Sequence, residues 1–263
     1  MTHRSDIEPD GDDGWRRLSY TRRCGWVDWG HALPTAAGRL IGEMRAMSDP
    51  ALRIAPGRLL LEGQPAFAVR YGLTSGAYGF VVHLGQDYVV RRNMSGADRW
   101  SAALGIFMHA SIGLENYQGS FPLNFLSGSS FSGEDLVSNL IGFYAAARGI
   151  RLKHMRDICG EVSVAESYRI WDTYLSGGLG GLKNHRFRPR LFQTQEDVRT
   201  AADLTWPLEL SSIRPSSAGT TWVPIRDQYI SQRLIDSGAV LTISGDGRLD
   251  VQRPGTIAVP QGR

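Results

Sequence analysis

The chain has 263 residues, of which 42% are hydrophobic and 21% are charged, and its formal net charge is +3. This composition excludes a coiled coil, a collagen-like fibre and a mostly disordered chain, because enough apolar residues are present to bury a core. The longest uncharged stretch with helical spacing runs from Trp100 to Leu114. Because a membrane span needs roughly 20 apolar residues, we expect none.

Basic residues and cysteines give only weak indications of partners. Two of the 29 basic residues are lysines and the others are arginines spread along the chain, so we expect no nucleic-acid binding. The densest basic run, KNHRFRPR at 183–190, could bind phosphate, but a solvated loop is the simpler interpretation. The polar N-terminus lacks the apolar segment of a secretory signal. With Cys24 and Cys159 as its only cysteines, the sequence predicts a cytoplasmic protein without disulfides.

The first part of the chain predicts one helix followed by a sheet. Residues 1–14 are expected to be a flexible acidic tail, and residues 15–263 a single domain. Pro34 suits the first turn of a helix, which predicts a helix over 34–48. The periodicity then changes, because residues 58–92 consist of short β-prone runs separated by turns that contain glycine. These runs predict a small antiparallel sheet.

The central segment predicts a long buried helix. Ser95 and Asp98 have the spacing of a capping box, and a helix over 96–118 follows them. No charged residue occurs between Arg99 and Glu115, so this helix is expected to be the buried centre of the fold.

The second half of the chain predicts two more helices and a hairpin. Ser132 and Ser163 are placed to cap helices over 133–148 and 163–176. Residues 182–220 are rich in proline and serine and predict an irregular, loop-rich segment. The remaining predicted elements are a strand near Trp222, a short helix near 228–235 and a C-terminal hairpin in AVLTIS-GDG-RLDVQR. Helices and strands occur in separate blocks, which favours an α+β fold.

Two helices carry polar stripes on otherwise apolar sequences. Asp135, Ser138, Asn139 and Gly142 share one face of the predicted helix 133–148. This face lacks the long charged side chains of a solvated surface, so either a neighbouring backbone or a ligand must approach it closely. On the preceding helix, Glu115 belongs to a second polar stripe, and a buried glutamate must be paired, protonated or bound to a metal.

A third polar unit lies in the aromatic N-terminal segment CGWVDWGH. Asp28 and His31 are three residues apart, so they would share a face if the segment were helical. An aspartate can orient a histidine and stabilise its charged form, which is the arrangement of many general acid–base catalysts. The spacing alone occurs often by chance. The motifs of nucleotide-binding loops, zincins and α/β-hydrolases do not occur in the sequence.

The segments G-W-V-D-W-G-H and S-S-F-S-G-E-D-L-V-S-N-L-I-G resemble a bacterial family of unknown function whose members often look like lipoproteins. The resemblance covers about residues 20–150, and this chain differs in having no lipoprotein leader. It implies that the two segments contribute to one site, but it implies no reaction. The matching positions are Gly25, Asp28, His31, Ser129, Ser130, Phe131, Ser132, Glu134, Asp135, Ser138, Asn139 and Gly142.

The leading hypothesis is an enzyme that acts on a small or lipid-like molecule by acid–base chemistry, as a hydrolase or as a cyclase or lyase. His31 would be the acid or base, Asp28 its orienting partner, and Glu115 or Asp135 a second carboxylate, with Ser138 and Asn139 in the same site. A divalent metal on His31, Glu115 and Asp135 is a variant of this hypothesis. Aromatic residues near these segments could line an apolar pocket: Trp26, Trp29, Tyr117, Phe121, Phe125 and Phe131.

Two alternatives remain open. Cys24 followed by His83 has the chain order of a papain-like cysteine hydrolase. The third hypothesis is a binding or effector-type protein without catalytic activity, which would contact other proteins through its aromatic N-terminal segment.

Overall fold

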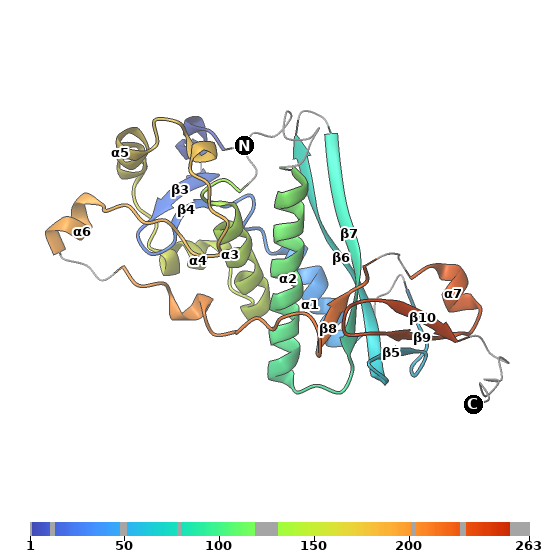
Figure 1. Ribbon diagram of the computed structural model, residues 1–263. Coiled ribbons are helices and arrows are strands. Elements are labelled where there is room, and N and C mark those ends of the chain that lie inside the picture. The colour runs from blue at the N-terminus through green and yellow to red at the C-terminus, as the bar shows by residue number, and fades with distance from the viewer. Residues whose placement is uncertain are drawn as a thin grey trace, which may run out of the picture. The chain divides into compact units, whose positions relative to one another are not determined.

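The structure, a computed structural model, confirms the α+β fold class. It describes residues 2–10, 14–47, 52–77, 80–118, 131–200, 204–226 and 230–252. Within these ranges it contains seven α-helices, a six-stranded mixed sheet and two small antiparallel strand pairs (Figure 1). No helix of the described ranges is both long enough and apolar enough to cross a membrane.

The chain forms two compact units, whereas the sequence analysis expects one domain over 15–263. Unit 1 consists of Met1–Arg39, Leu73–His83 and Phe107–Ile213, and unit 2 of Leu40–Gly72, Leu84–Ile106 and Arg214–Arg263. Helix α2 (Gly96–Gln118) therefore contributes residues to both units.

The N-terminal segment of unit 1 is folded, so the predicted tail is wrong for residues 2–10. Arg4–Ile7 form a 3-10 helix, η1, and Ile7 is fully buried. Arg4 makes a two-pronged ion pair with Asp172 at 2.8 Å. Strand β1 (Pro9–Asp10) pairs with β2 (Trp15–Arg16). The ion pair of Arg4 joins residues 168 positions apart, which no local sequence pattern indicates.

Unit 1 is built on the β3–β4 hairpin and a set of helices. Strands β3 (Leu18–Thr21) and β4 (Gly25–Asp28) pair antiparallel. Tyr20, Trp26 and Trp171 form an aromatic cluster with edge-to-face contacts in the core of this unit. The remaining elements assigned mainly to unit 1 are α3 (Asp135–Arg148), α4 (Leu152–Cys159), α5 (Val164–Tyr174), η3 (Leu179–Gly181), α6 (Gln195–Thr200) and η4 (Leu208–Leu210).

The predicted helices match the observed ones closely, with three differences. Helix α1 (Thr35–Ala46), α2, α3 and α5 occupy the predicted ranges, whereas the sequence predicts neither α4 nor α6, which lies in the segment expected to be irregular. Helix α4 has only eight residues and no side-chain cap, so it lacks the usual start signal. Helix α2 is not buried all round, because Ile112 is 37% exposed while Phe107 is 2% exposed.

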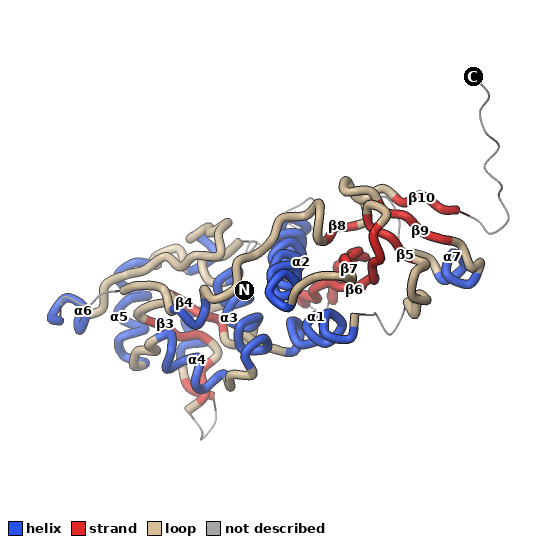
Figure 2. Tube along the Cα trace, turned by 90° about the horizontal axis from the view of Figure 1, so that it is seen from below, coloured by secondary structure: helices blue, strands red, loops and turns tan. Residues whose placement is uncertain are grey.

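Unit 2 is organised around the mixed sheet. The strand order is β10-β9-β5-β6-β7-β8, and the strands are β5 (Leu59–Leu61), β6 (Gln64–Ala77), β7 (Phe80–Arg91), β8 (Trp222–Pro224), β9 (Val240–Ile243) and β10 (Leu249–Gln252). Figure 2 shows the β9–β10 hairpin beside β5, with α7 (Gln232–Asp236) next to it. The C-terminal hairpin therefore extends the sheet, and it does so through a parallel pairing of β5 with β9 that the sequence analysis misses.

Glycine 105 shows how α2 packs within unit 2. A Cβ atom at Gly105 would lie 2.3 Å from the carbonyl oxygen of Ser216 and 2.9 Å from the indole nitrogen of Trp222. The absence of a side chain at this position lets the helix backbone approach the chain that leads into β8.

We predict that Phe107→Ala lowers the free energy of unfolding by about 3–5 kcal/mol, the usual range for a buried phenylalanine. Phe107 packs against Phe143 with ring centroids 5.1 Å apart, so its removal leaves a cavity. Ile112→Ala on the same helix is the control and should cost about 1 kcal/mol or less, because Ile112 is partly exposed. Equal losses of unfolding free energy for the two variants, measured by urea denaturation, would contradict the burial of Phe107 and the partial exposure of Ile112 on α2.

Candidate functional site

The turn after β4 carries His31, and Asp28 fixes this turn. The buried Asp28 carboxylate accepts hydrogen bonds from the backbone N–H groups of Gly30, at 2.8 Å, and His31, at 3.3 Å. Its second oxygen is 3.3 Å from the guanidinium of Arg17. The segment is a turn and not a helix, so Asp28 orients His31 through its backbone N–H, while the charge of its carboxylate helps to raise the pKa of the imidazole.

The imidazole of His31 pairs instead with the first residue of α3. Its Nδ1 lies 3.2 Å from Oδ1 of Asp135. The His31 side chain is 46% exposed, whereas that of Asp135 is 8% exposed. The other oxygen of Asp135 accepts hydrogen bonds from the backbone N–H and the hydroxyl of Ser132, at 3.0 and 2.6 Å. A buried, fully oriented carboxylate therefore holds an imidazole that remains accessible.

The small polar stripe on α3 is explained by a close backbone approach. Ser138 accepts the N–H of Asp28 at 2.9 Å and donates to the carbonyl of Glu134 at 2.7 Å. A Cβ atom at Gly142 would lie 2.9 Å from the carbonyl oxygen of Ala32. Among the described residues no side-chain hydrogen bond joins the partly buried Asn139 to this site. Ser138 thus supports the turn that carries His31.

Two glutamates are buried beside this pair. Glu115 accepts the backbone N–H of Phe131 at 2.6 Å. Glu134 accepts a short hydrogen bond from the hydroxyl of Thr2, and its other oxygen has no hydrogen-bond partner among the described residues. Glu115 is 3% exposed and Glu134 1% exposed, so each carboxyl group has lost most of its hydration.

The environment shifts the pKa values of these groups in a consistent way. Burial and the neighbouring Asp135 carboxylate raise the pKa of Glu115 to about 7 and that of Glu134 to about 7. Desolvation lowers the pKa of His31, but the hydrogen bond to Asp135 and the surrounding carboxylates outweigh it and raise the pKa to about 9. Near neutral pH the imidazole of His31 is therefore charged, while each of the two glutamates is partly protonated.

The metal variant of the acid–base hypothesis gains no support from this geometry. Within the described ranges, no group of three or more histidine, cysteine, aspartate or glutamate side chains is arranged to hold a metal ion.

The predicted apolar pocket is not formed by the tryptophans. Trp26 belongs to the core cluster of unit 1, and the fully buried Trp29 donates from its indole to Ser19 at 2.7 Å. Phe131 is buried and packs on the ring of His185 with centroids 4.2 Å apart. Phe121, Phe125 and the side chain of Tyr117 lie outside the described part of the chain.

The geometry around Cys24 does not favour a nucleophilic thiol. Cys24 is fully buried, and its free thiol is hydrogen-bonded with that of Cys159. Burial and Cys159 raise the pKa of Cys24 well above its ordinary value, whereas a catalytic thiolate needs a lowered pKa. The side chain of His83, in β7, is outside the described part of the chain.

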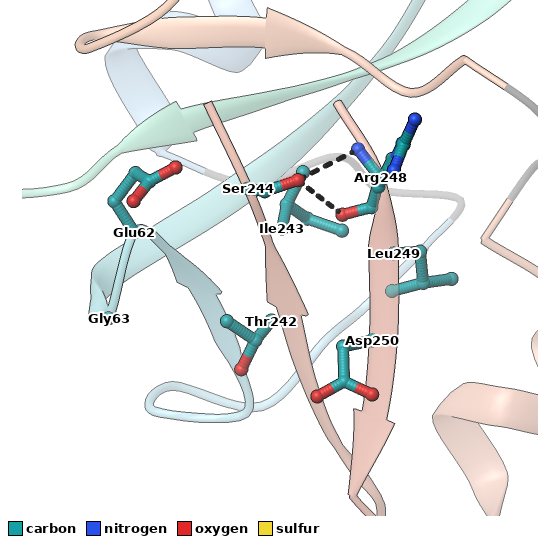
Figure 3. A pocket seen from close by; sticks show the side chains of 8 residues that line it. All are labelled: Glu62, Gly63, Thr242, Ile243, Ser244, Arg248, Leu249 and Asp250. Carbon is teal, nitrogen blue, oxygen red and sulfur yellow. Dashed lines mark hydrogen bonds between the residues drawn. The ribbon is translucent and has the colours of Figure 1, made fainter. Parts of the chain in front are cut away.

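A small pocket in unit 2 is not lined by a cluster of buried titratable residues like the one beside His31. It has a volume of about 280 Å³ and lies at the β9–β10 turn (Figure 3). The hydroxyl of Ser244, on its wall, bonds to both the N–H and the carbonyl of Arg248, at 3.1 and 3.2 Å. These hydrogen bonds of Ser244 stabilise the turn of the β9–β10 hairpin.

Sequence reasoning missed Glu134 and Thr2 as parts of this site. Glu134 occurs in the S-S-F-S-x-E-D segment, but it directly precedes the charged Asp135, so the sequence gives no clear sign of its burial. Thr2 gave no signal, because its contact spans 132 residues.

We predict that Glu134→Gln reduces the fall in stability between about pH 4.5 and 7. A carboxyl group whose pKa rises from 4.5 to about 7 on folding stabilises the protein below pH 4.5, and this contribution is lost as the pH rises through 7. The contribution of one such group is on the order of 3 kcal/mol, at about 1.4 kcal/mol per pKa unit. Urea denaturation at several pH values measures it.

The matched control is Glu209→Gln, which makes the same change at an exposed residue of η4. Its pH profile of stability should follow that of the wild type. An unchanged profile for Glu134→Gln would show that Glu134 is ionised normally in the folded protein.

Comparison with known proteins does not extend these observations. No protein-family model, no curated protein and no solved structure matches the chain. The resemblance to the bacterial family of unknown function therefore stays a prediction, and the functional argument depends on the geometry of unit 1.

Proposed function

We propose that unit 1 is an enzyme that transforms a small molecule by general acid–base catalysis, with His31 as the acid and a buried glutamate as the base. The observation that carries this proposal is the contact of 3.2 Å between the exposed His31 and the buried Asp135, beside two further buried carboxyl groups. Structural histidines are commonly buried with their partners, whereas an imidazole that is half exposed can reach a substrate.

The assignment of roles follows from the pKa values. A group that gives up a proton must hold it at the working pH, and His31 does so because its pKa is about 9. A base must be partly ionised at that pH, which fits Glu115 and Glu134 with pKa values of about 7. At a working pH near 7 each of these carboxyl groups is therefore ionised in part of the molecules and protonated in the rest.

The other residues would position these groups. Asp135 holds the imidazole in one orientation and stabilises its charge. Asp28 and Ser138 fix the turn that carries His31, so we assign them supporting roles and not proton transfer. A reaction that needs both proton donation and proton abstraction, such as hydrolysis or elimination, suits this arrangement.

The alternatives have less support. The buried Cys24 thiol with its raised pKa weighs against a cysteine hydrolase. A purely structural or effector role is less well supported, because buried carboxyl groups with raised pKa values lower the stability of a fold and are concentrated at sites that transfer protons.

We predict that His31→Ala lowers turnover by roughly 10²–10⁴, the range for loss of a general acid–base group. The substrate can be sought by screening purified protein against panels of small esters, amides and phosphate esters. The wild-type rate should be bell-shaped in pH, rising near 7 and falling near 9, because the base must lose its proton and the acid must keep its own. Turnover that His31→Ala leaves unchanged would refute the assignment.

A test without a substrate is the titration of His31 by NMR. In Asp135→Asn the pKa of His31 should fall from about 9 toward 6.5, because the carboxylate that accepts its hydrogen bond is gone while desolvation remains. Asp157→Asn is the control, since it alters an exposed histidine–aspartate pair at His154. A wild-type His31 that titrates near 6.5 would contradict the proposed role.

A further inference from the structure

A basic loop is attached directly to the candidate site. Residues 183–190 contain four basic side chains, and no acidic residue occurs between Asp172 and Glu196. All four basic residues are exposed: Lys183, Arg186, Arg188 and Arg190. No carboxylate among the described residues forms an ion pair with any of the three arginines, although the chain pairs many of its other arginines.

One end of this loop is fixed to the chain that precedes α3. The backbone N–H of Asn184 donates to the carbonyl of Phe131 at 2.9 Å, and its side-chain amide donates to the carbonyl of Gly133 at 3.2 Å. The ring of His185 packs on Phe131. The backbone N–H of the same Phe131 donates to Glu115. Phe131 therefore contacts both the basic loop and a buried glutamate.

The other end of the loop lies against β4. A Cβ atom at Gly25 would be 2.7 Å from the carbonyl oxygen of Arg190 and 3.2 Å from Pro189. Gly25 also has a φ of +68°, which favours glycine. Both segments that form the site, the β4 hairpin and the start of α3, therefore hold the basic loop.

The loop is also ordered internally. The side chain of Asn184 accepts the N–H of Arg186 at 3.0 Å and donates to the carbonyl of Arg188 at 2.9 Å. A single asparagine thus closes the turn that presents both arginines. A solvated loop with no role would need neither this internal order nor attachment at both ends.

We propose that the basic loop 183–190 binds an anionic group, phosphate or carboxylate, on the small-molecule substrate of the site. Guanidinium groups suit this role because their paired N–H donors match the geometry of both anions. The proposal rests on the proposed function of unit 1, and it adds the chemical class of the substrate.

The charge of the site itself does not oppose such a ligand. Asp135 is paired with the charged His31, and the raised pKa values keep the two glutamates partly protonated near neutral pH. The four basic residues of the loop therefore dominate the local field and favour the approach of an anion.

The test measures binding of inorganic phosphate and of citrate by isothermal titration calorimetry at low salt. The double variant Arg186→Gln/Arg188→Gln should weaken binding at least about tenfold, because each lost charge-assisted hydrogen bond contributes appreciably to affinity. The matched control is Arg214→Gln/Arg233→Gln, which removes the same charge at exposed arginines of unit 2. It should change binding less than twofold. Equal weakening in both variants, or no binding of either anion, would overturn the proposal.

Phosphate and citrate test separately whether the loop binds a phosphate group or a carboxylate group. Binding of phosphate alone would assign a phosphate group to the substrate, and binding of citrate alone a carboxylate. A single-stranded oligonucleotide that binds through the loop while neither small anion does would replace the proposal with a nucleic-acid surface.

NMR distinguishes failure of this inference from failure of the proposed function. The bound anion should shift the imidazole resonances of both His185 and His31. Shifts at His185 alone would place the anion away from His31, and they would overturn the inference that the loop binds the substrate of this site. A His31 pKa near 9 without anion binding would refute only the substrate class, whereas an ordinary His31 pKa would refute the proposed function regardless of anion binding.

Discussion

The close approach of the β4 turn to helix α3 is the constraint on which the site of unit 1 depends. Asp135, Ser138 and Gly142 occupy successive turns of one helix face, and each meets the end of β4 or the turn that follows it. Because Gly142 has no side chain, the carbonyl of Ala32 reaches the helix surface. A larger residue at 142 would separate the two backbones, and the contacts of His31 and Asp28 with the helix would be lost with it.

Burying several carboxyl groups in one place has an electrostatic cost that the site offsets only in part. The charged His31 compensates Asp135, while Glu115 and Glu134 avoid much of the cost by taking up protons. The same groups would be more stable in a fold that left them hydrated. Retained buried charge with raised pKa values is a common property of sites that move protons.

The parts of this structure that the sequence predicts are those with a local pattern. Helical periodicity gives α2, α3 and α5, and the small polar face of α3 indicates a close neighbour. Ser95 and Ser163 cap α2 and α5 as predicted. The predicted cap Ser132 is wrong, because α3 begins at Asp135 without a side-chain cap and the Ser132 hydroxyl donates to the Asp135 carboxylate. The pairing of β5 with β9 and the contact of Thr2 with Glu134 join distant segments, so no local pattern reports them. The spacing of Asp28 and His31 fits a helix and a turn equally well, and only in the turn does the Asp28 carboxylate bind the backbone.

Phe131 connects the acidic cluster to the basic loop, and its backbone conformation is unusual. Its φ of +55° lies in the left-handed region, which costs a bulky residue about 1–2 kcal/mol. Three contacts hold it there: Glu115 binds its N–H, Asn184 binds its carbonyl, and His185 packs on its ring. Relaxing this conformation would turn the N–H away from Glu115 and the carbonyl away from Asn184. These contacts offset the cost of the conformation, and through them one residue joins the buried Glu115 to the basic loop.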